Sequence, residues 1–177
     1  MNDWQSVLMF ILMIVSTIAA ICDLYFNKIP NWLTFPAAVV AVVYHTALSG
    51  WGGFLFSLEG IILGTALLVP YYLLGGMGAG DVKLMGAAGG FLGPHGVLMA
   101  FLFTALTGGL YAFILLARHG SLKKSAIRFK TMLTTFLLTK NLVYIPPPEI
   151  KQKPRLLYGL VIAVGTLLAM GLGNRVS

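Results

Sequence analysis

The chain has 177 residues, of which 58% are hydrophobic and only 10% are charged. A typical soluble domain carries about 25% charged residues, so this composition excludes an ordinary water-exposed surface and indicates a protein embedded in lipid. Lysine and arginine outnumber aspartate and glutamate by 12 to 5, for a formal net charge of +7. The single cysteine, Cys22, excludes an internal disulfide. The sequence has no HExxH or GxSxG motif, which argues against a zincin helix and the common serine-hydrolase signature.

Apolar segments recur along the chain at the length that a bilayer requires. A helix needs about 20 apolar residues to cross roughly 30 Å of hydrocarbon. One segment is rich in glycine, carries two charged residues and ends at Gly93-Pro94, where proline disfavours a helix. We predict one all-α domain over residues 1–177, a polytopic membrane protein with about six transmembrane helices, at about 4–22, 31–49, 54–74, 75–93, 95–117 and 155–173.

The basic residues predict the orientation of these helices. Six spans place eleven of the 12 basic residues on one side of the membrane: Lys28, Lys83, Arg118, Lys123, Lys124, Arg128, Lys130, Lys140, Lys151, Lys153 and Arg155. The positive-inside bias makes that side cytoplasmic and both termini external. Most of these residues lie in a basic cytoplasmic loop at about 118–155. Its segment 121–140 is either an amphipathic helix on the membrane surface or a plain loop that sets topology.

Three of the five acidic residues touch predicted spans. Ionisable groups inside a membrane are costly and are therefore candidates for function. Asp23 ends the first predicted helix and Asp81 begins the fourth, so both lie at cytoplasmic depth. Glu59 lies in the outer leaflet, where we expect an interface carboxylate that is paired or solvated. Asp23 and Asp81 are thus the candidate reactive pair.

Two carboxylates at one depth can perform peptide hydrolysis without a metal or a cofactor. When they are close they resist double ionisation and share one proton. The ionised member then takes a proton from water, and the protonated member polarises the scissile carbonyl. Singly, Asp23 could be a helix-end residue and Asp81 an N-cap. The helix dipole predicts that Asp81, at a helix N-terminus, is mainly ionised and that Asp23, near a C-terminus, mainly holds the proton.

Two segments around these aspartates resemble a known family. The run Gly78-Ala79-Gly80-Asp81-Val82-Lys83-Leu84 resembles the GxGD motif of the type IV prepilin peptidases. Asp23, followed by Ile29-Pro30-Asn31-Trp32-Leu33-Thr34, is similar to that family's first-aspartate segment. Leu157-Tyr158-Gly159-Leu160 resembles its last helix, although many members have proline before the tyrosine. The chain resembles in particular the short members that serve tight-adherence (Flp-type) pili.

The resemblance implies a membrane aspartyl endopeptidase with Asp23 and Asp81 as its catalytic residues. Such an enzyme removes the short basic leader of a prepilin on the cytoplasmic side of the bacterial inner membrane. The implied partners are the prepilin, the bilayer and pilus-assembly machinery, with no nucleic acid. Longer members carry a Cys-rich segment linked to N-methylation. This chain lacks one, so we expect no N-methyltransferase activity.

Four further residues are expected to bind substrate or shape the site: Gly78, Gly80, Lys83 and Asn31. The two glycines leave the backbone bare enough for a substrate strand to approach, or they form a packing face for neighbouring helices. Lys83 is either a partner for the Glu that follows the cleavage point in the family's substrates or a lysine that extends to the membrane interface.

Two other functions fit part of the sequence. A proton-coupled transporter or channel could use Asp23 and Asp81 to relay protons, as membrane carboxylates often do. A non-enzymatic membrane subunit of a pilus or secretion machine could use the basic loop to dock partners. The two aspartate motifs together favour the peptidase.

Overall fold

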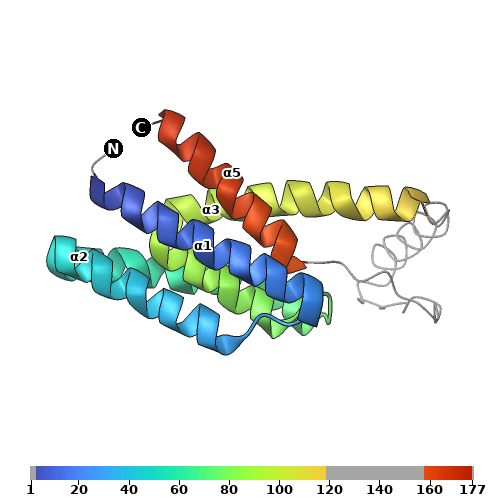
Figure 1. The fold of residues 1–177 in the computed structure, drawn as a ribbon, viewed down its shortest axis with the longest axis horizontal. Helices are drawn as coiled ribbons and strands as arrows, with labels where there is room; N and C mark the ends of the chain where they lie inside the picture. Colours follow the sequence, from blue (N-terminus) through green and yellow to red (C-terminus); the bar gives the residue numbers. More distant parts are fainter. Residues whose placement is uncertain (1–2, 119–157, 177) are drawn as a thin grey trace, which may run out of the picture. The chain divides into compact units, whose positions relative to one another are not determined.

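The computed structural model describes residues 3–118 and 158–176, which contain helices and no strand. The helices are α1 (Asp3–Phe26), α2 (Asn31–Leu73), α3 (Ala79–Arg118) and α5 (Tyr158–Val176) (Figure 1). The chain divides into two compact units, residues 1–108 with 157–177, and residues 109–156. The prediction of an all-α protein is confirmed for the described residues.

Three of the described helices are long and apolar enough to cross a membrane, over Ser6–Phe26, Asn31–Leu73 and Ala79–Ile114. The apolar stretch of α5, Tyr158–Gly171, is shorter. The chain is therefore a multi-pass membrane protein, but the predicted count of six spans is not supported, because the described residues form four helices. The prediction treated residues 50–53 and 94 as connections between separate helices, whereas in α2 and α3 the break is confined to one residue, Gly50 or Gly93.

One glycine interrupts each of the two longest helices. Gly50 in α2 has φ 57° and ψ −135°, and Gly93 in α3 has φ 69° and ψ −178°. Residues with a Cβ atom disfavour a positive φ angle, whereas glycine adopts it readily. A straight helix of the length of α2 would rise about 65 Å, roughly twice the thickness of the hydrocarbon layer. Figure 1 shows α2 doubling back on itself instead.

Contacts with the N-terminal part of α3 give the directions of the two parts of α2. The first part of α2 runs parallel to the start of α3, and the second part of α2 runs antiparallel to it. The pairs are Asn31 with Lys83 and His45 with Phe91, then Gly60 with Gly89 and Gly64 with Met85. The chain thus reverses at Gly50, and the start of α3 packs against both parts of α2.

Small residues let α2 and α3 approach closely. A Cβ atom added to Gly60 would collide with the backbone of Gly89. Nearby, the buried Ser57 hydroxyl donates a hydrogen bond to the Gly90 carbonyl oxygen at 2.7 Å. In lipid, close packing and interhelical hydrogen bonds hold helices together, since burial of apolar side chains gains little there. The glycine-rich start of α3 is therefore fixed in place.

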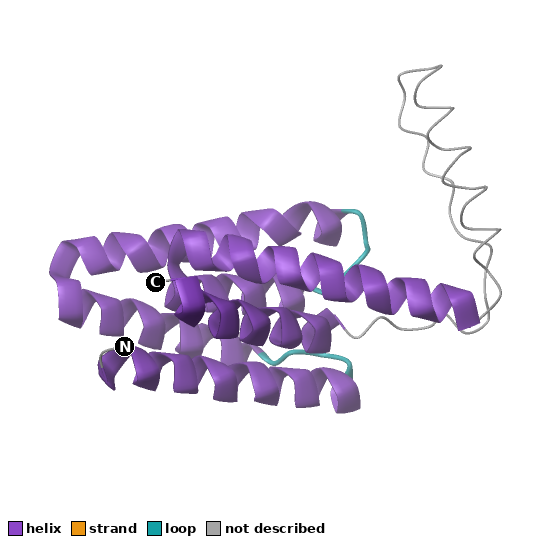
Figure 2. Ribbon diagram, turned by 90° about the horizontal axis from the view of Figure 1, so that it is seen from above, coloured by secondary structure: helices purple, strands orange, loops and turns teal. Residues whose placement is uncertain are grey.

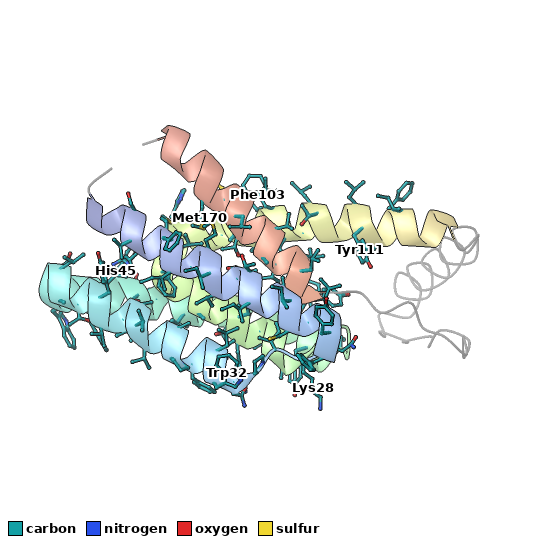
Figure 3. The ribbon with its side chains drawn as sticks, in the orientation of Figure 1. Lys28, Trp32, His45, Phe103, Tyr111 and Met170 are labelled. Atoms are coloured by element: carbon teal, nitrogen blue, oxygen red, sulfur yellow. The ribbon has the colours of Figure 1, made fainter. Side chains whose placement is uncertain are left out.

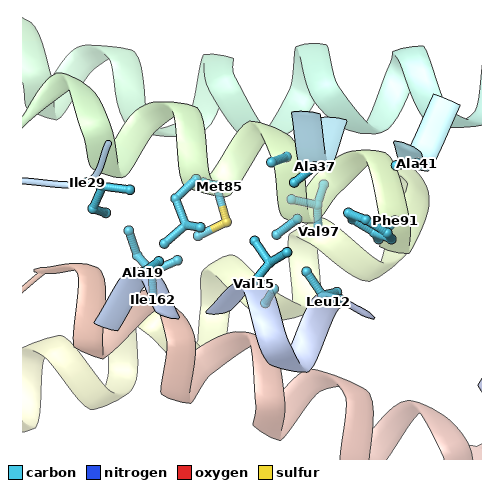
Figure 4. Close-up of a cluster of buried hydrophobic side chains, with 14 of the residues drawn as sticks. Leu12, Val15, Ala19, Ile29, Ala37, Ala41, Met85, Phe91, Val97 and Ile162 are labelled. Atoms are coloured by element: carbon cyan, nitrogen blue, oxygen red, sulfur yellow. The ribbon is translucent and has the colours of Figure 1, made fainter. Parts of the chain in front are cut away.

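Helix α5 packs against α1 and α3 and completes the core of the first unit. Ile162 of α5, Ala19 of α1 and Met85 of α3 belong to one buried cluster (Figure 4). Gly165 lies so close to Thr104 of α3 that an added Cβ atom would overlap it. Figures 1 and 2 both show that α1 begins and α5 ends at the same end of this unit. The end of α1 therefore meets the start of α5.

The outer surface of the helices is apolar. Large exposed apolar areas are rare on soluble monomers and mark contact with a membrane or a partner. Side chains that are more than half exposed occur on α1, α2 and α3, and include Phe10, Val39, Val43, Ile62, Leu102 and Leu106. This surface agrees with a position within lipid.

Most of the predicted basic loop at 118–155 lies outside the described residues. The same holds for its segment 121–140 and for the first residues of the predicted span 155–173, whose helix is described from Tyr158 onward. The predictions for these segments stay predictions.

Candidate active site

Asp23 and Asp81 come together at one end of the first unit. Asp23 lies in the last turn of α1, and Asp81 is the third residue of α3. Between α1 and α2, the buried Ile29 packs against Gly80, where an added Cβ atom would lie 3.0 Å from the Ile29 Cβ. The connection after Asp23 is thereby held against the turn before Asp81.

Asn27 ends α1 and directs the connection toward the site. Its φ of 52° is left-handed, a conformation in which asparagine is the usual alternative to glycine at a helix C-terminus. Its amide donates a hydrogen bond to the Asp23 carbonyl oxygen at 2.9 Å. The chain then turns out of the helix, and Asn27, Lys28 and Ile29 line the space beside the Asp23 side chain.

The Asp81 carboxylate is fixed by the turn that precedes it. The Gly78 amide donates a hydrogen bond to Asp81 Oδ2 at 3.0 Å, and the Asp81 amide donates to the Gly78 carbonyl oxygen at 3.2 Å. A carboxylate at the third helical position that reaches back to the preceding amide is half of a capping box. The Asp81 side chain is buried, with 7% of its surface exposed, so its rotamer is fixed by both hydrogen bonding and packing.

The Asp23 carboxylate is held by a different helix. The Gly159 amide, in the first turn of α5, donates a hydrogen bond to Asp23 Oδ2 at 2.8 Å. Each aspartate therefore accepts one backbone amide at the start of a helix. The dipole argument considered only the C-terminus of α1 beside Asp23, and the structure adds the N-terminus of α5 on its other side. The assignment of the proton to Asp23 stays a prediction.

Both carboxylates line one cavity of about 260 Å³, together with Asn27, Lys28, Ile29, Gly78, Ala79 and Gly80. The two aspartates are close enough to interact electrostatically. A shared cavity, a fixed orientation and mutual repulsion are what a carboxylate pair needs to hold a single proton. The arrangement can activate a water molecule and polarise a carbonyl group without a metal.

The two glycines before Asp81 have different surroundings. Ile29 of the same chain occupies the space that a side chain at Gly80 would fill. The absence of a side chain at Gly80 therefore serves packing within the protein. Gly78 and Ala79 are exposed and line the cavity. The backbone there is open to a substrate strand, which was the expectation for both glycines.

Lys83 and Asn31 contact each other outside the residues that line the cavity. Lys83 Nζ donates a hydrogen bond to Asn31 Oδ1 at 2.9 Å and lies 5.3 Å from the centre of the Phe35 ring. These contacts join the start of α3 to the start of α2. They give Lys83 a structural role that neither alternative included, and the choice between a substrate partner and a lysine that extends to the membrane interface stays untested.

Three residues at the site were missed by sequence reasoning. Lys28 and Asn27 line the cavity, and Figure 3 shows Lys28 at the connection between α1 and α2. The sequence could have indicated both residues, because they lie between Asp23 and Pro30. A connection of only four residues keeps them near the end of α1 and therefore near Asp23. The contact of Gly159 with Asp23 spans 136 residues of sequence, and the similarity of its segment to the family's last helix was the only signal.

The remaining candidates lie apart from the cavity. Glu59 is exposed on α2, next to Gly60, which packs about two turns along α3 from Asp81. His45 Nε2 lies 3.2 Å from the Phe91 carbonyl oxygen. Within residues 3–118 and 158–176, no three His, Cys, Asp or Glu residues cluster as metal ligands.

A comparison with protein families matches residues 10–113 to the type IV leader peptidase family, Peptidase_A24. The matched part covers more than half of the chain and contains both aspartates of the cavity, so the chain belongs to this family. Membership points to an aspartic-type leader peptidase of the bacterial inner membrane that acts on prepilins. The chain matched none of the curated proteins and none of the solved structures with which it was compared.

Proposed function

We propose that this protein is a membrane aspartyl endopeptidase that removes the short basic leader of Flp-type prepilins, with Asp23 and Asp81 as its catalytic residues. The observation that carries the proposal is the single cavity lined by both carboxylates. Family membership supports the prepilin class of substrate. The Flp type follows the resemblance of the two aspartate segments and of Leu157-Tyr158-Gly159-Leu160 to the family members that serve tight-adherence pili.

The proposed reaction uses the two aspartates as a pair with one proton. The ionised carboxylate takes a proton from water while the water oxygen attacks the scissile carbonyl carbon. The protonated carboxylate gives its proton to the carbonyl oxygen, which forms a neutral gem-diol. The C–N bond then breaks, the new amine takes a proton from one aspartate, and the new carboxyl group returns a proton to the other. The pair ends with one proton, as it began.

The substrate enters, in this proposal, beside the backbone of Gly78 and Ala79. Both residues are exposed at the cavity and carry little side-chain bulk. An extended segment can therefore bring its carbonyl close to the carboxylates, which proximity and orientation require. The apolar outer face of α1 and α2 lets the membrane helix of the substrate remain in lipid while its scissile bond is cleaved.

We also propose that α2 and α3 each cross the membrane twice, with their reversals at Gly50 and Gly93. The chain then makes six crossings, with the cavity on the cytoplasmic side and both termini outside. Lys28 and Lys83 lie at the cavity end, and in this topology the basic residues that follow Arg118 in the sequence would also be cytoplasmic. This orientation follows the positive-inside bias. In this proposal, residues 1–177 form a single peptidase domain.

Co-expression of the full chain with a Flp-type prepilin tests the function directly. The prepilin should lose its leader, seen as a faster band on a gel and as a new N-terminus by mass spectrometry. Cleavage should continue in EDTA, because the proposed chemistry uses no metal. An intact prepilin with correctly inserted protein would contradict the substrate class. Inhibition by EDTA that zinc reverses would contradict the aspartyl mechanism.

A further inference from the structure

Helix α5 lies beyond the residues that match the family model, which end at 113. Its first turn nevertheless contacts the candidate active site. The Gly159 amide donates a hydrogen bond to Asp23 Oδ2 at 2.8 Å. The first turn of α5 therefore reaches the Asp23 carboxylate.

We propose that Gly159 is a positioning residue for the peptidase reaction. It holds the Asp23 carboxylate in place from the far end of the chain, a role that rests on the proposed function. The Gly159 amide lies in the first turn of α5, where backbone amides have no partner within the helix. The Asp23 carboxylate supplies that partner, and the amide in turn fixes one of the two carboxylate oxygens.

The space around Gly159 requires the absence of a side chain. A Cβ atom at this position would lie 2.9 Å from both the Cβ and Oδ2 of Asp23 and 3.0 Å from its Cγ. The backbone of Gly159 is not left-handed, and alanine favours helices more than glycine does. Replacement by alanine is therefore compatible with α5 itself, and its effect falls on the Asp23 side chain.

Two other glycines of α5 provide matched controls. Gly165 packs against Thr104, so Gly165→Ala disturbs the contact between α5 and α3 without touching an aspartate. Gly171 has no atom within 4 Å of an added Cβ, so Gly171→Ala tests the effect of alanine on the helix alone. A structural role for α5 predicts that Gly165→Ala is the more harmful change. A positioning role predicts that Gly159→Ala selectively slows cleavage.

The kinetic test uses the full-length protein in lipid vesicles with a Flp-type prepilin. Gly159→Ala should lower kcat about 10- to 100-fold, the order expected for a misplaced catalytic group, with KM within about twofold of wild type. Gly171→Ala should match wild type, and Gly165→Ala should lower the melting temperature while the folded fraction keeps its kcat. Wild-type kcat in Gly159→Ala would overturn the proposal, as would an equal fall in kcat in folded Gly165→Ala.

A second measurement does not depend on how Gly159→Ala folds or on activity. In protein labelled with ¹⁵N-glycine, Asp23→Asn keeps the shape of the side chain but weakens the charge-assisted hydrogen bond. The Gly159 amide proton should move upfield and exchange faster in this variant, while Gly165 and Gly171 stay unchanged. An unchanged Gly159 resonance would overturn the proposal. Cleavage by Asp23→Asn would instead refute the proposed function, so the two failures are distinguishable.

Discussion

Lys83 and Asn31 show how a charged residue in an active-site motif can serve structure. Lys83 Nζ donates a hydrogen bond to Asn31 Oδ1 and lies over the Phe35 ring. We expect Lys83→Gln and Asn31→Ala each to lower the free energy of unfolding by about 0.5–1.5 kcal/mol, the usual net value of a hydrogen bond. A double-mutant cycle should show that the two effects overlap. Neither variant should change kcat more than a few-fold.

The alternative for Lys83 is a salt bridge with an acidic residue of the substrate. Lys83→Glu should then fail on the normal prepilin and recover with a charge-reversed one. The contacts of Lys83 predict no such recovery, and a recovery would show that Lys83 releases Asn31 to bind substrate.

Gly80 connects the packing of the site to its chemistry. A Cβ at this position would lie within 3.0–3.3 Å of Ile29, so Gly80→Ala should push the connection after Asp23 away from Asp81. We expect a loss of about 1–3 kcal/mol in stability from overpacking and a fall in kcat of about 10- to 100-fold. Unfolding and cleavage assays measure both. Gly109→Ala, on the same helix with no atom near its added Cβ, is the control, and equal kcat in both variants would contradict the account.

At the scale of the elements, the glycines that interrupt α2 and α3 should differ in their sensitivity to substitution. Gly50 has φ 57° with open space around it, whereas a Cβ at Gly93, with φ 69°, would collide with the Phe56 ring. Gly50→Ala should cost about 1–2 kcal/mol from the left-handed backbone alone. Gly93→Ala should cost about 1–3 kcal/mol more because of the collision. Unfolding measurements that rank Gly50→Ala as the more harmful change would contradict this ordering.

Most residues of the predicted spans that the structure describes are helical, yet the connections between the spans were not predictable. The segments 31–49 and 54–74 fit the two parts of α2, but hydropathy shows only where apolar runs weaken. It does not show that a single residue, Gly50, can reverse a helix without a loop. Asp23 and Asp81 could be chosen as candidates from the sequence because charges within apolar helices are rare. The contact of Gly159 with Asp23 depends on tertiary packing, which the hydrophobic periodicity of a sequence does not predict.

At the scale of the whole molecule, the proposed six crossings can be tested by labelling single cysteines in a Cys22→Ser background. Trp51 lies beside the Gly50 reversal and is exposed, and Lys28 and Gly76 lie at the cavity end and are exposed. A membrane-impermeant maleimide added outside the cell should label Trp51→Cys. It should label Lys28→Cys and Gly76→Cys only after permeabilisation. Labelling of Trp51→Cys and Gly76→Cys from the same side would show that the second part of α2 does not return across the membrane.

The central claim is that Asp23 and Asp81 act together on a peptide bond. The most direct test is cleavage of a Flp-type prepilin by Asp23→Asn and Asp81→Asn, with Glu59→Gln as a control that removes an exposed carboxylate far from the cavity. Asparagine keeps the shape of the side chain but cannot carry the proton. Each Asn variant should insert normally and release no leader, while Glu59→Gln keeps most of the activity. Cleavage at the wild-type rate by either Asn variant would contradict the paired mechanism.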